Sequence, residues 1–124
     1  MKYEEIVADL KAGKYAPIYF LSGEESYFLD DIATRIEKNA LTEDEKAFNQ
    51  TILYGNDVSM TTVTDTARRF PMMSQRQVVI VKEAQNIRDF ENLLPYIDHL
   101  QPTTILVFLY KKKKSDMQNH GQNR

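Results

Sequence analysis

The chain has 124 residues, of which 42 % are hydrophobic and 27 % charged, a composition that predicts one packed domain rather than two domains or a disordered chain. Its net charge of −2 provides no overall attraction to nucleic acid or to an anionic membrane, and the absence of cysteine excludes disulfides and thiol chemistry. Residues 1–5 do not form a signal peptide and the apolar run at residues 105–110 is too short to cross a bilayer, so we expect a cytoplasmic protein.

The first half of the chain alternates between helix and strand patterns. The apolar positions of a first predicted helix follow helical spacing: Tyr3, Ile6, Val7 and Leu10. Gly13 ends this helix, and Pro17 opens a short apolar strand at residues 18–21. A turn at residues 22–26 leads to a second helix with these inner positions: Leu29, Ile32, Ala33 and Ile36. We expect residues 42–46 to form a polar connector and residues 48–54 to form a second strand, which ends at a turn over residues 55–57.

The second half of the chain repeats this alternation. Ser59 is the expected N-cap of a third helix, and Pro71 disfavours helical geometry at the residue before it, so this helix should end near Phe70. The inner positions of the third helix are Met60, Val63, Ala67 and Phe70. A strand at residues 78–81 follows, and a last strand is predicted at residues 104–109. Between them, a fourth helix has the inner positions Phe90, Leu93, Leu94 and Ile97, and Pro95 either kinks this helix or marks a break.

Three of the four predicted strands are apolar without interruption, which is typical of strands covered on both faces. Because helices alternate with these strands, we predict an α/β fold, a three-layer sandwich around a parallel sheet. Residues 1–114 form this domain, and residues 115–124 are a polar tail without periodicity. The lysine run at residues 111–114 either contacts phosphates or solvates the end of the last strand, and the lack of interleaved aromatic residues favours solvation.

The turns after the strands lack the residues of a nucleotide site. A phosphate-binding loop needs glycines, a lysine and a hydroxyl at the start of a helix. Here Gly23 is followed five residues on by Phe28, and the intervening glutamates at residues 24–25 would repel a phosphate. Lys82 stands after the third strand, where a nucleotide hydrolase needs an aspartate for magnesium. We therefore expect no ATP site; the alternative is a divergent nucleotide-binding hydrolase.

Other catalytic arrangements are equally absent from the sequence. Asp30 and Asp31 are interpreted as a solvated acidic first turn of the second helix, favoured by the helix dipole, rather than as a metal or phospho-acceptor pair. A receiver-like signalling domain, which is a further alternative, would need acidic residues at the ends of the first and third strands. His99 and His120 have no metal-ligand spacing, and Ser22 and Ser26 have no nucleophile-elbow setting. We predict no catalytic residue, no cofactor and no metal site.

The connection between the third helix and the third strand is apolar in its middle, where Phe70, Pro71, Met72 and Met73 follow one another. Connections normally lie on the surface, so an apolar run there indicates a surface for another protein. The alternative is that these side chains complete the core. We expect that for Phe70, as part of the third helix, and we expect at least one of Met72 and Met73 to be exposed.

Three segments of the chain resemble the delta subunit of the bacterial DNA polymerase III clamp loader. Residues 16–30 read APIYFLSGEESYFLD, similar to the family's opening of proline, apolar strand, glycine and two glutamates. Residues 70–82 read FPMMSQRQVVIVK, similar to the family's apolar tip, serine, basic residue and strand. Residues 104–108 with the following lysines resemble the family's fourth strand. The resemblance covers residues 1 to about 114 in matching order.

The resemblance implies a fold of the AAA+, RecA-like P-loop NTPase type that lacks a functional phosphate loop, with strand order 1-4-3-2. It implies a non-catalytic component of the DNA-directed DNA polymerase III holoenzyme, a nucleotidyltransferase complex. Such a component binds the sliding clamp, or beta subunit, and helps to open its ring during DNA replication. Other clamp-loader subunits are further partners, DNA contact is weak, and no membrane is involved.

The resemblance also assigns roles to the apolar connection. Met72 and Met73 match the two apolar residues that enter a pocket on the clamp, where leucine or phenylalanine is common in the family. Phe70 and Pro71 belong to the same clamp-binding tip. Independently of the resemblance, their charge makes the flanking arginines candidate rim contacts that steer the tip onto an acidic clamp surface, or else solubilising charges: Arg68, Arg69 and Arg76.

Overall fold

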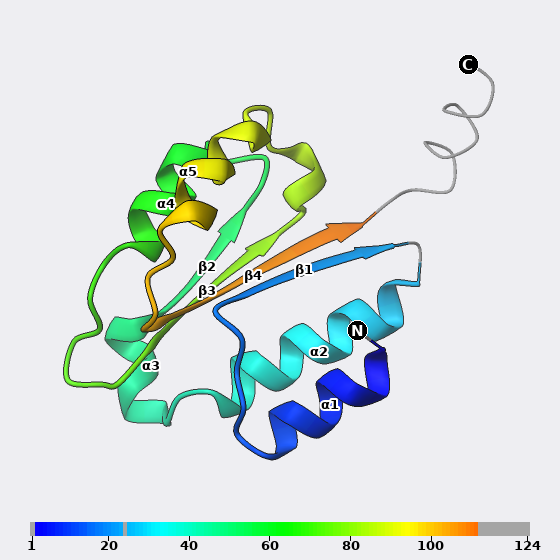
Figure 1. The fold of residues 1–124 in the computed structure, drawn as a ribbon, viewed down its shortest axis with the longest axis vertical. Coiled ribbons are helices and arrows are strands. Elements are labelled where there is room, and N and C mark those ends of the chain that lie inside the picture. Colours follow the sequence, from blue (N-terminus) through cyan, green and yellow to red (C-terminus); the bar gives the residue numbers. More distant parts are fainter. Residues whose placement is uncertain (1, 24, 112–124) are drawn as a thin grey trace.

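A computed structural model describes residues 2–23 and 25–111 of the chain. Within them, β1 (Ile18–Gly23), β4 (Thr104–Lys111), β3 (Gln77–Lys82) and β2 (Gln50–Tyr54) lie side by side in that order and pair in parallel (Figure 1). This is the strand order that the resemblance implied.

Helices cover both faces of the sheet (Figure 1). On one face lie α1 (Tyr3–Lys11) and α2 (Ser26–Asn39); on the other lie α4 (Met60–Ala67), α5 (Leu94–Asp98) and the short 3₁₀ helices η1 (Ala84–Asn86) and η2 (Phe90–Leu93). The central strand β3 serves both layers, because its successive side chains alternate. Val78 and Ile80 pack against α2, Val79 and Val81 pack with the α4 layer, and all four are fully buried. The predicted three-layer α/β sandwich is therefore confirmed.

Residues 42–46 do not form the expected polar connector. They begin α3 (Glu43–Asn49), which a capping box starts: the Thr42 hydroxyl accepts the backbone N–H of Glu45, and the Glu45 carboxylate accepts the backbone N–H of Thr42 at 2.9 Å. The predicted start of the second strand is wrong for the same reason, since β2 begins at Gln50. Phe48 lies on α3 with 74 % of its surface exposed.

The third predicted helix is correct at its start and wrong at its end. Ser59 caps α4 by accepting the backbone N–H of Thr62, as expected. Three of the four predicted inner positions are fully buried: Met60, Val63 and Ala67. The helix ends at Ala67, so Phe70 lies beyond it and is 76 % exposed. The expectation that Phe70 completes the core is therefore wrong, because the chain leaves the helical path before its side chain reaches the sheet.

The fourth predicted helix is broken into η2 and α5, as one of the two interpretations of Pro95 anticipated, and Pro95 stands in the first turn of α5. The break changes which side chains face inward. Leu93 and Tyr96 are buried, whereas Leu94 and Ile97, two predicted inner positions, are exposed. The inner positions were assigned on one continuous helix, and this assignment fails because the segment forms two separate helices.

The last strand continues to Lys111, two residues beyond the prediction. Residues 112–124, which include most of the lysine run, the polar tail and His120, lie outside the described residues. Among the described residues, no helix combines the length and hydropathy needed to cross a lipid bilayer.

Candidate functional site

The apolar connection forms a loop at the amino-terminal edge of the sheet, which we call the tip loop (residues 68–76). It joins α4 to β3 and extends outward beside α3 in Figure 1. The carboxyl ends of the strands, where open parallel sheets bind ligands, lie at the opposite edge. The tip loop therefore lies at the opposite edge of the sheet from the usual ligand site of such folds.

Side chains from other elements fix the base of the tip loop. The last carbonyls of a helix have no partner within it. At the end of α4 they are satisfied by Thr104, which donates to the Ala67 carbonyl at 2.6 Å, and by Gln101, which donates to the Arg68 carbonyl at 3.0 Å. The buried amide nitrogen of Gln77 lies 2.8 Å from the next carbonyl, that of Arg69. The direction in which the loop leaves the domain is thus set by hydrogen bonds.

Asn49, at the end of α3, holds the middle of the tip loop. Its side chain is buried, and it pairs with the backbone of Met72 as a neighbouring strand would. The Asn49 amide donates to the Met72 carbonyl at 2.8 Å and accepts the Met72 N–H at 2.7 Å. Asn49 therefore satisfies both backbone polar groups of Met72, while the Met72 side chain remains open to solvent. Its exposure is 61 %.

Glu45 holds the far side of the tip loop through Ser74. The Ser74 hydroxyl donates to the second carboxylate oxygen of Glu45 at 2.6 Å and accepts the backbone N–H of Arg76 at 3.3 Å. The pKa of the Glu45 carboxyl is lowered from 4.5, mainly by this hydrogen bond and then by the backbone N–H of Thr42. The ionised carboxylate therefore links the start of α3 to the loop.

Met73 is the most exposed apolar side chain of the tip loop. It is 99 % exposed, and its backbone has φ 55°, in the left-handed region that residues with a Cβ adopt at a cost. Pro71 is partly buried. The tip loop therefore presents Phe70, Met72 and Met73 to solvent on a backbone that is held in place.

The three arginines have different surroundings. The Arg76 guanidinium lies over the Tyr15 ring, 4.8 Å from its centroid, and the Arg68 guanidinium lies 5.4 Å from the centroid of the Tyr96 ring. Arg69 is exposed and has no such aromatic partner among the described residues. These contacts distinguish the three arginines, which the sequence analysis treated together as candidate rim contacts or solubilising charges.

The carboxyl edge has a different character. Phe28, at the position where a phosphate loop starting at Gly23 would have its second glycine, packs its ring against that of Tyr3 with centroids 4.8 Å apart. Lys111 forms an ion pair with Asp30 at 2.8 Å. Residues 2–23 and 25–111 contain no cluster of three or more His, Asp or Glu side chains arranged to hold a metal ion.

The expectation of a solvated acidic first turn for α2 is wrong. Asp30 and Asp31 lie in its second turn, and both have partners. Asp30 is bound by Lys111, while Asp31 accepts hydrogen bonds from the Tyr3 hydroxyl and from Arg35, which in that order lower the pKa of its carboxyl. These carboxylates connect α2 to α1 and to β4.

The sequence analysis identified the exposed methionines but not the residues that hold the tip loop in place. Asn49 was assigned to a strand and Glu45 to a connector, although the Thr-x-x-Glu spacing of residues 42–45 is a recognisable capping box. Nothing in the sequence marks Asn49, Gln77 or Thr104, because their partners lie 23, 8 and 37 residues away in the chain.

The four-stranded parallel sheet of this chain, in the order β1-β4-β3-β2, has the same fold as the corresponding part of a solved DNA clamp loader delta protein. The domain of a gamma subunit-related DNA polymerase III protein from Thermotoga maritima matches it with a TM-score of 0.62 at 12 % identity, over 95 % of this chain and 43 % of that one. At that identity the match shows the fold alone.

The sequence profile described as "DNA polymerase III, delta subunit" matches residues 19–120, so the chain belongs to the delta subunit family of DNA polymerase III. The DNA polymerase III subunit delta of Bacillus subtilis is 27 % identical over 122 residues, 90 % of this chain and 35 % of the relative. The structure of the DNA clamp loader delta protein of Bacillus subtilis matches with a TM-score of 0.77 at 26 % identity, over 94 % of this chain and 39 % of that one. The chain spans about a third of the length of the curated relative.

Proposed function

We propose that this chain binds the sliding clamp of a bacterial DNA polymerase through the tip loop and helps to open the clamp ring during DNA replication. The observation that carries the proposal is the exposure of Met72 and Met73 on a backbone held by Asn49 and Glu45. Membership of the delta subunit family supports the same partner. Phe70 and Pro71 complete the contact surface, and other clamp-loader subunits are further partners of the whole protein.

The physical chemistry of the tip suits this role. Burying a methionine side chain contributes about 1.5–3 kcal/mol, which is the size of an interface hot spot. Methionine is flexible and polarizable and therefore adapts to a preformed pocket. Because the backbone below it is already ordered, binding costs less conformational entropy than it would for a mobile loop. The two side chains are thus placed to provide most of the affinity.

In this proposal the chain itself catalyses no reaction. The chain supplies binding, and the energy for clamp loading comes from ATP hydrolysed on other subunits. The aromatic packing of Phe28 and the Lys82 side chain at the end of β3 both argue against an ATP site at the carboxyl edge. Calorimetric titration with ATP and magnesium should give no binding heat, and saturable binding there would favour the divergent hydrolase instead.

The test is to replace Met72 and Met73 together by alanine and to measure the affinity for a purified bacterial sliding clamp. We expect the dissociation constant to rise about 100-fold or more, since each lost side chain corresponds to about a factor of ten. The matched control is Leu94→Ala, which removes from α5 an apolar side chain about as exposed as that of Met72. Unchanged affinity of the double variant, with an unchanged melting curve, would refute the proposal.

A further inference from the structure

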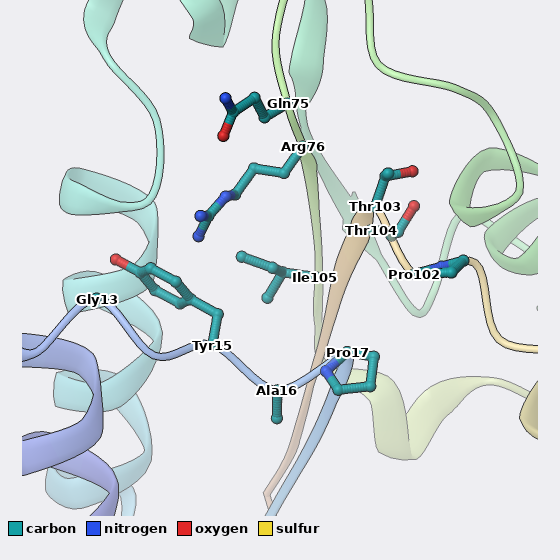
Figure 2. Close-up of a pocket in the computed structure, with 10 residues that line it drawn as sticks. All are labelled: Gly13, Tyr15, Ala16, Pro17, Gln75, Arg76, Pro102, Thr103, Thr104 and Ile105. Atoms are coloured by element: carbon teal, nitrogen blue, oxygen red, sulfur yellow. The ribbon is translucent and has the colours of Figure 1, made fainter.

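A pocket of about 480 Å³ adjoins the tip loop at the amino-terminal edge of the sheet. The segments that lead into β1, β3 and β4 line it, and Figure 2 shows the residues that they contribute. Two of its lining residues, Gln75 and Arg76, belong to the tip loop itself. A partner seated on the methionines therefore has this pocket beside it.

Arg76 is the charged group of the pocket. Its guanidinium lies beside the Tyr15 ring in Figure 2, 4.8 Å from the ring centroid, and forms no ion pair with a carboxylate among the described residues. Stacking on an aromatic ring orients the guanidinium and leaves the N–H groups at its edge free to bind a carboxylate with two parallel hydrogen bonds. Glu45 lines the adjoining pocket with Arg76, but Thr42 and Ser74 already bind its two oxygens.

The rest of the lining is uncharged. Pro17 and Ile105 provide apolar surface, and the hydroxyls of Thr103 and Thr104 point away from Arg76 in Figure 2. Thr104 uses its hydroxyl to bind the Ala67 carbonyl inside the domain. A side chain with a short alkyl part and one negatively charged group fits this lining. Its alkyl part would pack on the apolar side of the pocket, and its charged group would bind the guanidinium.

We infer that this pocket receives an aspartate or glutamate side chain of the protein that the tip loop binds, as a second anchor beside the methionines. The inference rests on the proposed function, and it names a feature of the partner: an acidic residue next to the pocket that takes Met72 and Met73. A DNA phosphate fits less well, because phosphate contacts rely on several exposed cations and here a single cation sits in a partly apolar hollow.

The experiment compares Arg76→Gln with Arg69→Gln in binding to a purified bacterial sliding clamp, at about 0.15 M and about 0.5 M salt, with rates measured by surface plasmon resonance. Both variants lose one positive charge from the same loop. We expect Arg76→Gln to raise the dissociation rate about tenfold and to do so at both salt concentrations, since salt screens a partly buried ion pair less than an exposed one. Arg69→Gln should act mainly on the association rate, and its effect should vanish at high salt.

Two further variants separate fold from contact. Tyr15→Leu keeps the apolar volume and removes the ring under Arg76, so it should reproduce part of the Arg76→Gln effect with an unchanged melting temperature. In addition, each acidic residue near the binding surface of the clamp can be replaced by its amide. One such replacement should weaken binding to the unaltered chain but not to the Arg76→Gln variant, as a direct ion pair requires.

The outcomes distinguish this inference from the proposed function. Clamp binding that depends on Met72 and Met73 but is equal in Arg76→Gln and Arg69→Gln would overturn the acidic anchor and leave the function standing. Absence of clamp binding by the unaltered chain would overturn both. A loss by Arg76→Gln of affinity for a fluorescent DNA duplex, with clamp binding intact, would assign the pocket to phosphate instead.

Discussion

At the scale of single residues, Met73 combines two properties that stability alone does not favour. Its side chain is almost completely exposed, and its backbone lies at φ 55°, where a Cβ costs about 1 kcal/mol. Met72 beside it has no positive φ and is held by Asn49. Strain at a residue whose apolar side chain faces solvent supports the proposed contact of Met73 with a partner.

Glycine at these two positions should separate strain from binding. Met73→Gly should leave the free energy of unfolding unchanged or raise it by about 0.5 kcal/mol, because glycine adopts positive φ without strain. Met72→Gly should lower it by about 0.5–1 kcal/mol, since glycine there only adds freedom to the unfolded chain. Both should weaken clamp binding. Urea denaturation gives the stabilities, and equal destabilisation by the two variants would contradict this assignment of strain.

At the scale of elements, α3 connects the capping of a helix to the position of the tip loop. Glu45 accepts the N–H of Thr42 at the start of α3 and the hydroxyl of Ser74 in the loop. The two interactions require the same ionised carboxylate. The folded-state pKa of Glu45 is therefore lower than its ordinary value of 4.5.

This shift predicts a pH dependence. A group whose pKa is depressed by folding stabilises the native state fully above its unfolded pKa, and this stabilisation is lost as the pH falls through the folded pKa. The stability difference between the unaltered chain and Glu45→Gln should thus be constant above pH about 5 and shrink below pH about 4. Chemical denaturation at several pH values measures it. If the stability difference persists at low pH, the loss in Glu45→Gln does not come from the charge of the carboxylate.

Another contact between elements lies at the opposite edge, where the turn after β2 touches the end of β3. The Gly55 N–H donates to the Lys82 carbonyl at 2.8 Å, and a Cβ at Gly55 would lie 2.0 Å from the Glu83 carbonyl oxygen. We expect Gly55→Ala to destabilise the domain by about 2 kcal/mol or more, because backbone must move. Gly13→Ala is the control: its φ is +75° but nothing lies within 4 Å, so it should cost only about 1 kcal/mol. Thermal unfolding compares the two.

At the scale of the whole molecule, charge is distributed unevenly although the net charge is only −2. The tip loop carries three arginines and no acidic residue beside its exposed apolar side chains, so it offers a local positive charge to a partner. Tyr15 and Tyr96 orient two of these arginines, and Arg69 alone extends from the loop without an aromatic partner among the described residues. Arg69 is therefore the arginine best placed to act at long range.

Arg69→Gln should lower the rate of association with the clamp about two- to fivefold at low salt, with no effect once the Debye length is short. Arg88→Gln removes the same charge from the segment after η1, beyond the carboxyl end of β3, and should leave the rate unchanged. Stopped-flow association at several salt concentrations measures both. Equal slowing by the two variants would show that net charge, not the tip loop, governs the encounter.

The sequence was a good guide where one local pattern decides the outcome. The uninterrupted apolar runs predicted β3 and β4 because a strand covered on both faces needs apolar residues on both. It was a poor guide to segment ends. Phe70 fitted a helical face by spacing, yet α4 ends at Ala67, where side chains from later in the chain satisfy the carbonyls of Ala67 and of the two residues after it. Leu94 and Ile97 were wrongly assigned to the core, because the break near Pro95 changes which side chains of α5 face the sheet.

By itself, the sequence determined the class of fold, the apolar character of the connection before β3 and the lack of a phosphate loop, since each depends on residue types within a short window. Only the tertiary structure decided that Met73 faces solvent, that Asn49 supports Met72, and that Arg76 rests on Tyr15 over a pocket. These features depend on hydrogen bonds and stacking between residues far apart in the chain, and packing alone brings such residues together.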